Sequence, residues 1–179
     1  MAKQYAGQDN VIYEICNEPN GAVTWKKHIK PYAKTIIGTI RKYSKNAVIV
    51  VGTPTWSQDV DVVAQSPLRS KNVMYALHFY AATHKEWIQD KLKKAHKKGL
   101  PVMVTEFSIC DASGNGALDK ASARKWMKLL DKYNISYTAW SLCNKNESSA
   151  LIESSCNKTS GWTRSNLSPA GKWYFDQTK

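Results

Sequence analysis

The stretch Val11-Ile-Tyr-Glu-Ile-Cys-Asn-Glu-Pro-Asn20 begins as an apolar strand pattern and ends in a loop that carries Glu18. A second stretch, Pro101-Val-Met-Val-Thr-Glu-Phe107, places Glu106 at the end of another short apolar run. In barrels of parallel strands and helices, side chains at the carboxyl ends of the strands form the active site. Two carboxyl groups flanking one bond are the requirement of glycoside hydrolysis, so the two glutamates predict that chemistry.

Strand-like runs alternate with amphipathic stretches along the chain, which predicts an α/β fold with a parallel sheet. We expect strands at about 11–17, 47–52, 73–79, 102–106 and 136–141. Helices are expected at about 24–43, 58–65, 84–98, 119–133 and 168–175, the last opening with the N-cap Ser168 and Pro169. A closed (β/α)8 TIM barrel needs eight βα units, so these five predict a partial barrel and one truncated domain over residues 1–179.

The alternation of side chains in a strand adds a prediction about which residues face the barrel interior. The inward set is even-numbered in four of the predicted strands: Ile12, Glu14, Cys16 and Glu18, then Met74, Ala76, His78 and Tyr80, then Val102, Val104 and Glu106, then Ser136, Thr138 and Trp140. Glu14 stands out because a carboxylate inside a barrel has to be paired. We therefore expect a buried carboxylate that needs a partner, which in a complete barrel could come from a strand that this chain lacks.

The formal net charge of +12 raises nucleic acid as a partner, but the residue types argue against it. Only four of the 26 basic residues are arginine, whose planar guanidinium suits phosphate and base recognition. The densest run, Lys91 to Lys98, ends at Gly99 and is typical of a solvated helix end. No segment has the length of a membrane span, and the first ten residues lack the apolar core of a signal peptide. We expect no nucleic-acid and no membrane partner.

The four cysteines, Cys16, Cys110, Cys143 and Cys156, have no CxxC spacing and no zinc-like pairing with histidine. A metal site is therefore not expected. Three of them fall near predicted strand ends and could be neighbours, but buried free thiols are the simpler interpretation. Their disulfide state stays open.

Four segments in order along the chain resemble the endo-β-1,4-glucanases (cellulases) of glycoside hydrolase family 5. They are Ile15-Cys-Asn-Glu-Pro-Asn-Gly21, His78-Phe-Tyr80, Val104-Thr-Glu-Phe107 with Asp111-Ala-Ser-Gly-Asn-Gly116, and Trp140-Ser-Leu-Cys-Asn-Lys-Asn-Glu147. The resemblance covers nearly the whole chain and implies strands 4 to 8 of the family's barrel. It implies hydrolysis of β-1,4-glucosidic bonds in cellulose or related β-glucans, with no cofactor. It also implies a secreted protein.

The resemblance gives the two glutamates different roles in a retaining double displacement. Glu18 resembles the general acid/base and Glu106 the nucleophile, which must be ionised to attack the anomeric carbon. Asn17 resembles the residue that hydrogen-bonds the sugar 2-hydroxyl. Tyr80 resembles the hydroxyl that bonds the nucleophile, and His78 the imidazole beside the acid/base, although a lone histidine on a strand is more often a core residue.

Four further residues resemble the family's substrate contacts. Trp140 would form a platform beneath the sugar, unless it is a buried packing residue. Trp56 resembles an aromatic that flanks the cleft. Lys145 and Glu147 resemble side chains that hold sugar hydroxyls. The last three could equally be loop-surface residues.

The five predicted units lack the arginine, histidine and aromatic residue that the family places on its earlier strands. We therefore expect an endoglucanase whose activity is weakened, or which is completed by another chain. The alternative is an inert fragment that dimerises and at most binds β-glucan, since an open sheet leaves strand edges and apolar surface uncovered. A homodimer is the simplest way to cover them.

Overall fold

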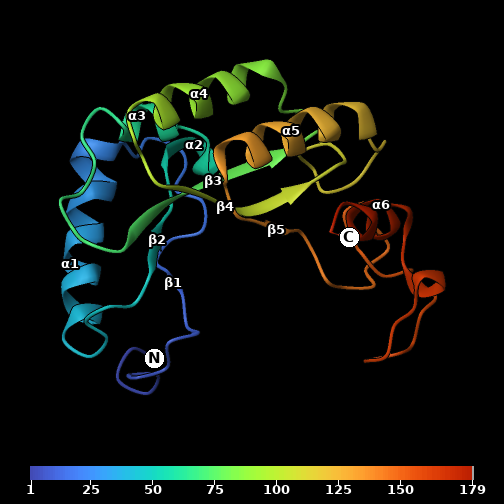
Figure 1. The fold of residues 1–179 in the computed structure, drawn as a ribbon, viewed down its shortest axis with the longest axis horizontal. Coiled ribbons are helices and arrows are strands. Elements are labelled where there is room, and N and C mark those ends of the chain that lie inside the picture. The colour runs from blue at the N-terminus through green and yellow to red at the C-terminus, as the bar shows by residue number, and fades with distance from the viewer. Residues whose placement is uncertain (179) are drawn as a thin grey trace. The chain divides into compact units, whose positions relative to one another are not determined.

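Five parallel strands follow one another along the chain in the computed structural model, which describes residues 1–178 (Figure 1). Pairing is parallel between β1 and β2, between β2 and β3, and between β4 and β5, and the strand order is β1-β2-β3-β4-β5. Their bounds are β1 Tyr13–Glu14, β2 Ile49–Val51, β3 Val73–Tyr80, β4 Val102–Ser108 and β5 Tyr137–Ala139. All five predicted strands are confirmed, although β1 is much shorter than the range 11–17.

Helices occupy the connections between the strands and also follow β5. They are η1 Trp25–Ile29, α1 Lys30–Arg41, α2 Pro54–Ser57, α3 Val60–Val63, α4 Glu86–Lys97, α5 Lys120–Tyr133, η2 Arg164–Asn166 and α6 Pro169–Gln177. All of the predicted helices are present, whereas α2 lies outside the predicted ranges. The predicted start of α6 is confirmed, because the Ser168 hydroxyl accepts a hydrogen bond from the Gly171 N–H at 3.0 Å. This alternation of strand and helix is a partial (β/α)8 fold.

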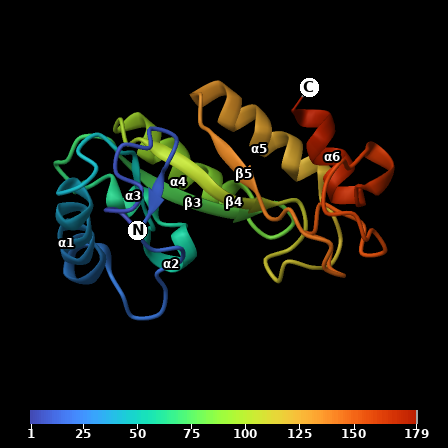
Figure 2. The same cartoon turned by 90° about the horizontal axis from the view of Figure 1, so that it is seen from below.

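The chain forms two compact units. The first unit contains Met1–His78 and Asp90–Met103, and the second contains Phe79–Gln89 and the chain from Val104 onward. Within the first unit, α1 lies to one side of β1 and β2 (Figures 1 and 2). Within the second unit, α5 lies alongside β5 in both views.

The core of the first unit joins its helices to the sheet. Trp25 of η1 is 1% exposed and meets the ring of Tyr75 in β3 edge to face, with ring centroids 5.7 Å apart. The apolar stripe of α1 continues this packing through the buried residues Ala33, Ile37 and Ile40. Their spacing of three and four residues is the helical period that the sequence showed.

The core of the second unit is an aromatic stack. Phe79 at the end of β3 stacks on Trp126 of α5, with ring centroids 3.9 Å apart, and on Phe107 of β4 at 5.2 Å. All three side chains are at most 1% exposed. The stack fixes β4 against the end of β3 from the helix side, which leaves the opposite side of these strands for other residues.

The prediction for the inward set holds on β3. Tyr75 and Phe79 pack against helices, and the even-numbered His78 and Tyr80, next to Phe79 on either side, lie on the other face. For Glu14 the prediction of a buried carboxylate is wrong. Its side chain is 31% exposed. The physical reason is that β1 is a two-residue strand at the end of the sheet, with β2 as its sheet neighbour, so Glu14 keeps access to solvent.

Within residues 1–178, no helix has both the length and the apolar character that crossing a membrane requires.

Candidate active site

Glu18 lies in the loop after β1, where a close backbone contact shapes the chain. Gly52, directly after β2, packs so tightly against this loop that a Cβ atom there would lie 2.2 Å from the Cys16 carbonyl oxygen and 2.8 Å from Pro19 Cδ. Only glycine allows the two backbones to approach in this way. The loop also receives a hydrogen bond from the Trp56 N–H to the Pro19 carbonyl at 3.1 Å. Glu18 is therefore held by its backbone rather than by a regular strand.

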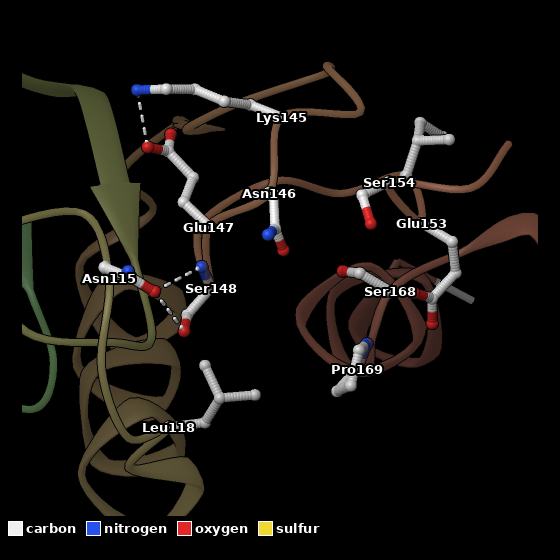
Figure 3. Close-up of a pocket in the computed structure, with 11 residues that line it drawn as sticks. Asn115, Leu118, Lys145, Asn146, Glu147, Ser148, Glu153, Ser154, Ser168 and Pro169 are labelled. Atoms are coloured by element: carbon white, nitrogen blue, oxygen red, sulfur yellow. Dashed lines mark hydrogen bonds and ion pairs between the residues drawn. The ribbon is translucent and has the colours of Figure 1, made fainter. Parts of the chain in front are cut away.

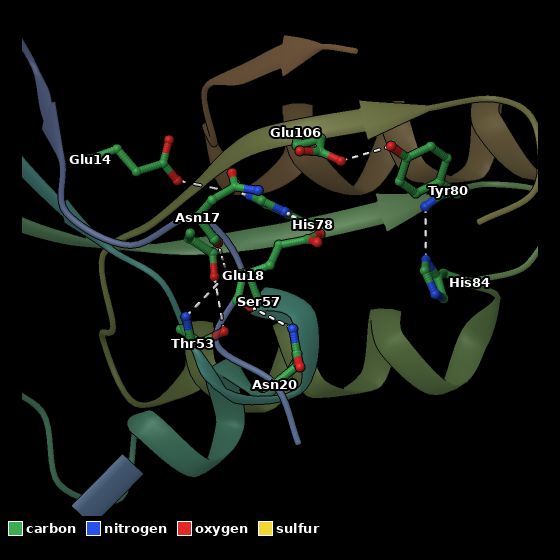
Figure 4. Close-up of polar contacts among 11 residues, drawn as sticks. Glu14, Asn17, Glu18, Asn20, Thr53, Ser57, His78, Tyr80, His84 and Glu106 are labelled. Carbon is green, nitrogen blue, oxygen red and sulfur yellow. Dashed lines mark hydrogen bonds and ion pairs between the residues drawn. The ribbon is translucent and has the colours of Figure 1, made fainter. Parts of the chain in front are cut away.

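The side chain of Glu18 contacts His78, as the sequence predicted (Figure 4). His78 Nδ1 lies 2.9 Å from Glu18 Oε1, and its Nε2 lies 3.9 Å from Glu14 Oε1. The imidazole is 2% exposed, whereas Glu18 keeps 28% of its side chain accessible. The contact with this buried ring orients the Glu18 carboxyl group, which solvent can still reach.

Glu106 lies inside β4, unlike Glu18, and is only 7% exposed. The Tyr80 hydroxyl donates a hydrogen bond to Glu106 Oε1 at 2.7 Å (Figure 4). A phenolic donor at this distance fixes the orientation of the carboxylate. The predicted contact between Tyr80 and Glu106 is therefore present.

His84 is a residue of this region that the sequence analysis missed. Its Nδ1 accepts a hydrogen bond from the Tyr80 N–H at 2.8 Å, and its carbonyl accepts one from Trp126 Nε1 at 2.8 Å. The ring is buried and closes the turn after β3. The only signal in the sequence is a histidine four residues after Tyr80, and that spacing alone does not predict a contact.

Both predicted substrate-binding tryptophans are exposed. Trp140 follows β5 and is 45% exposed, so the alternative of a buried packing residue does not apply. Its backbone N–H donates to the Phe107 carbonyl at 2.8 Å, which continues the pairing of β5 with β4. Trp56, in α2, is 49% exposed. An exposed indole offers the flat apolar face that stacks on a sugar ring.

Asn17 lies beside Glu18 in the loop and is exposed. Its carbonyl oxygen accepts a hydrogen bond from the Ser57 hydroxyl at 2.7 Å. The backbone of Asn17 is thus held while its side chain is accessible.

Lys145 and Glu147 pair with each other in the loop after Trp140. Lys145 Nζ lies 2.7 Å from Glu147 Oε2, and the Ser149 hydroxyl donates to Glu147 Oε1 at 3.0 Å. The hydrogen bond from Lys145 lowers the pKa of Glu147, and the same bond raises the pKa of Lys145. Both line an open hollow of about 440 Å³ that reaches the start of α6 (Figure 3). Polar side chains around an open hollow can bind hydroxyl groups.

The four cysteines, all within the described residues, are free thiols. Cys110 and Cys156 are buried, and Cys16 and Cys143 are partly buried. Burial, helped by the charge of Glu14, raises the pKa of Cys16. Burial also raises the pKa of Cys110. All are free thiols, as the simpler interpretation expects, but of the three near strand ends only Cys110 is buried.

The parallel βα fold, with one glutamate after β1 and another in β4, defines the class of (β/α)-barrel glycoside hydrolases. A family model described as cellulase (glycosyl hydrolase family 5) matches residues 1–146. The chain belongs to this family.

Curated relatives and solved structures agree with this assignment. An endoglucanase of Clostridium saccharobutylicum is 50% identical over 171 residues, which are 96% of this chain and 38% of the relative. Endoglucanase 5 of Pectobacterium carotovorum is 43% identical over 179 residues, 100% of this chain and 35% of its own length. The catalytic domain of a Thermobifida fusca endoglucanase, solved in complex with cellotetraose, superposes with a TM-score of 0.91 at 35% identity, covering 98% of this chain and 59% of that one. The chain thus spans well under half the length of these two curated relatives.

Proposed function

We propose that this chain hydrolyses β-1,4-glucosidic bonds by a retaining double displacement, with Glu18 as general acid/base and Glu106 as nucleophile. One observation carries the proposal: each glutamate contacts a side chain of β3, Glu18 through His78 and Glu106 through Tyr80. These are the contacts that two carboxyl groups with different tasks require. Membership of family 5 and the endoglucanase names of its relatives support the substrate class.

The two steps use the glutamates in turn. In the first step a carboxylate oxygen of Glu106 attacks the anomeric carbon, and Glu18 donates its proton to the leaving glycosidic oxygen. In the second step Glu18 removes a proton from water, whose oxygen displaces Glu106 and releases the sugar with its original configuration. Such a mechanism requires the two carboxyl groups to be about 5–5.5 Å apart. The Tyr80 hydroxyl donates to Oε1 of Glu106 and so orients the carboxylate that attacks.

The accessible aromatic and polar residues supply the proposed substrate contacts. Trp140 and Trp56 stack on sugar rings through their exposed indole faces. The exposed Asn17 side chain bonds the sugar 2-hydroxyl, a contact that strengthens in the transition state. Lys145 and Glu147 bind further hydroxyls as a pair, because their mutual salt bridge fixes both groups beside the hollow.

A trapping experiment tests the proposed roles. A dinitrophenyl 2-deoxy-2-fluoro-β-cellobioside should form a stable glycosyl-enzyme, and peptide mass spectrometry should locate the sugar on Glu106. Glu106→Gln should prevent labelling. Glu18→Gln should still be labelled, since dinitrophenolate leaves without acid assistance, but should cleave p-nitrophenyl cellobioside about 10²–10⁴-fold more slowly. Sugar attached to any other residue would contradict the assignment.

We further propose that the 179-residue polypeptide, taken alone, is a weak catalyst that self-associates. The sheet ends at β1 and β5, so each of these strands presents an edge, and the neighbouring Ile12 is 51% exposed. Sedimentation velocity at several concentrations should show a dimer whose proportion rises with concentration. A monomer at all concentrations with turnover equal to that of full-length relatives would contradict both parts of this proposal.

The second candidate function is binding of β-glucan without hydrolysis. The exposed tryptophans favour it, since stacking does not depend on a complete catalytic centre. Titration with cellotetraose, followed by tryptophan fluorescence and product analysis, separates the two. Saturable binding with no product after extended incubation would select the binding function over the enzyme.

A further inference from the structure

A short turn after β2 has an unusual backbone. Thr55, Trp56 and Ser57 have φ angles of 57°, 54° and 56° in succession, and none of them is glycine. Residues with a Cβ atom avoid this left-handed region, and a β-branched threonine avoids it most. Such conformations persist where surrounding contacts impose them, and they gather at functional sites. The contacts that impose this turn therefore indicate what it does.

The hydroxyl of Ser57 connects the turn to the loop that carries Glu18. It donates a hydrogen bond to the Asn17 carbonyl at 2.7 Å and accepts one from the Thr53 N–H at 3.2 Å (Figure 4). Ser57 and Thr53 are both fully buried. A buried hydroxyl that serves as donor and acceptor at once has its direction fixed by both partners.

Two further contacts make the turn and the loop a single structural element. The Trp56 N–H donates to the Pro19 carbonyl, and Gly52 packs against the Cys16 carbonyl and the Pro19 ring without room for a side chain. The Thr53 hydroxyl anchors the same segment to the sheet through the Ala76 carbonyl of β3 at 3.1 Å. The carbonyls on both sides of Glu18, those of Asn17 and Pro19, are thus bound by consecutive residues of the turn.

We propose that Ser57 is a positioning residue for the acid/base Glu18. Its hydroxyl holds the Asn17 carbonyl, and the left-handed turn is the conformation that brings this hydroxyl and the Trp56 N–H to the loop together. The same turn presents the indole of Trp56 to solvent. A sugar stacked on Trp56 therefore contacts the turn that holds the backbone on both sides of Glu18. This inference rests on the proposed function, because it assigns Ser57 to the proton-transfer role of Glu18.

The test uses two variants that both lack the hydroxyl. In Ser57→Ala, the alanine still has a Cβ atom and so remains unfavourable at the positive φ of this position. In Ser57→Gly, the glycine adopts that φ without a steric cost. If the hydroxyl positions Glu18, both variants should hydrolyse p-nitrophenyl cellobioside about 10²-fold more slowly in kcat/KM, because small misplacements of a catalytic group have effects of that size. Dinitrophenyl cellobioside, which needs little acid assistance, should lose only about threefold or less. Ser122→Ala, a buried serine in α5, is the matched control and should change neither rate.

A loss that is equal for the two substrates would overturn the proposal, since general damage to the fold does not depend on the leaving group. Hydrogen exchange of the Trp56 amide provides a second readout that needs no turnover. It should become at least about tenfold faster in Ser57→Ala, while amides in the middle of α1 stay unchanged. If the wild-type chain cleaves neither substrate, the proposed function fails, but the exchange result still decides whether Ser57 holds the loop that carries Glu18. An unchanged Trp56 exchange rate would overturn that role.

Discussion

The two glutamates are held in opposite ways by the two units of the molecule. In the second unit, Glu106 belongs to a regular strand whose other side packs on the stack of Phe79, Phe107 and Trp126. In the first unit, Glu18 lies beyond a two-residue strand and is held by backbone contacts with the segment Gly52–Ser57. Glu106, the proposed nucleophile, is buried, so it can be fixed by the same packing that stabilises the fold. The proposed proton donor, Glu18, must remain accessible and needs other support, and we propose that the turn in an unfavourable conformation supplies it.

The largest expected effect is a loss of unfolding free energy when the aromatic stack of the second unit is disrupted. Trp126→Ala deletes a fully buried indole that stacks on Phe79 and donates to the His84 carbonyl. Large-to-small changes of buried aromatics cost about 3–5 kcal/mol of unfolding free energy. Denaturant unfolding of the wild-type and variant proteins measures this loss of free energy. Trp87→Ala, at a tryptophan that is 50% exposed, is the matched control and should cost about 1 kcal/mol or less. Equal losses would show that the stack is not what supports β4.

The next largest effect is a loss of activity caused by a substitution in the first unit. Gly52→Ala places a methyl group against the Cys16 carbonyl and Pro19, and neither backbone can move without shifting Glu18. We expect kcat/KM on p-nitrophenyl cellobioside to fall about 10²-fold. Gly38→Ala is the control, because it lies in α1 with open space around it and should stabilise the helix by about 0.5–1 kcal/mol. Wild-type turnover in Gly52→Ala would mean that the loop is not set by this contact.

These two cases also separate what the sequence could predict from what it could not. The strand that carries Glu106 is predictable, because the run Val102 to Phe107 has strand propensity and the residue alternation follows from the pleat. The contact of Tyr80 with Glu106 was expected from the resemblance to family 5, which gave Tyr80 as the hydroxyl beside the nucleophile. The element that holds Glu18 is different. Its left-handed φ angles fall on Thr55, Trp56 and Ser57, residue types that avoid this region, so no propensity signals the turn.

Glu14 shows a second limit of the sequence. Strand alternation placed Glu14 on the inward face, and we predicted from this that its carboxylate is buried. Burial depends on how long the strand is and how many neighbours it has, and β1 has two residues at the end of the sheet. The pairing of Lys145 with Glu147 was equally hidden, because a turn in an irregular loop brings these side chains together.

A smaller expected effect is the pH dependence of the stability that Asp119 gives to the second unit. Asp119 caps α5 by accepting the Ser122 N–H at 2.9 Å, and it pairs with Lys85. The hydrogen bond from Lys85, followed by that from Ser122, lowers the pKa of Asp119. A carboxyl group with a lowered folded pKa stabilises the fold above its unfolded pKa of about 3.9, and this contribution disappears as the pH falls through the lower folded value.

Asp119→Ala should therefore cost about 1 kcal/mol at pH 7 and progressively less below about pH 4. Asp119→Asn keeps a good cap while losing the charge, so it should cost less than the alanine variant at pH 7. Urea unfolding of the three proteins at pH 7 and at acidic pH measures these differences. A cost that does not change with pH would show that the carboxylate charge is not involved.

The smallest effect tests the backbone conformation of the turn itself. Thr55 is exposed, has φ of 57°, and its hydroxyl donates to Asp59 Oδ2 at 2.7 Å. Thr55→Ala and Thr55→Gly both lose that hydrogen bond, but only glycine adopts the left-handed region freely. The glycine variant should therefore be the more stable by about 1 kcal/mol in thermal unfolding. At Thr39, an exposed position in α1, the same pair should show the reverse order by about 1 kcal/mol, because glycine weakens a right-handed helix. Opposite signs at two threonines of one unit would demonstrate that the turn stores strain, and the same sign at both would refute it.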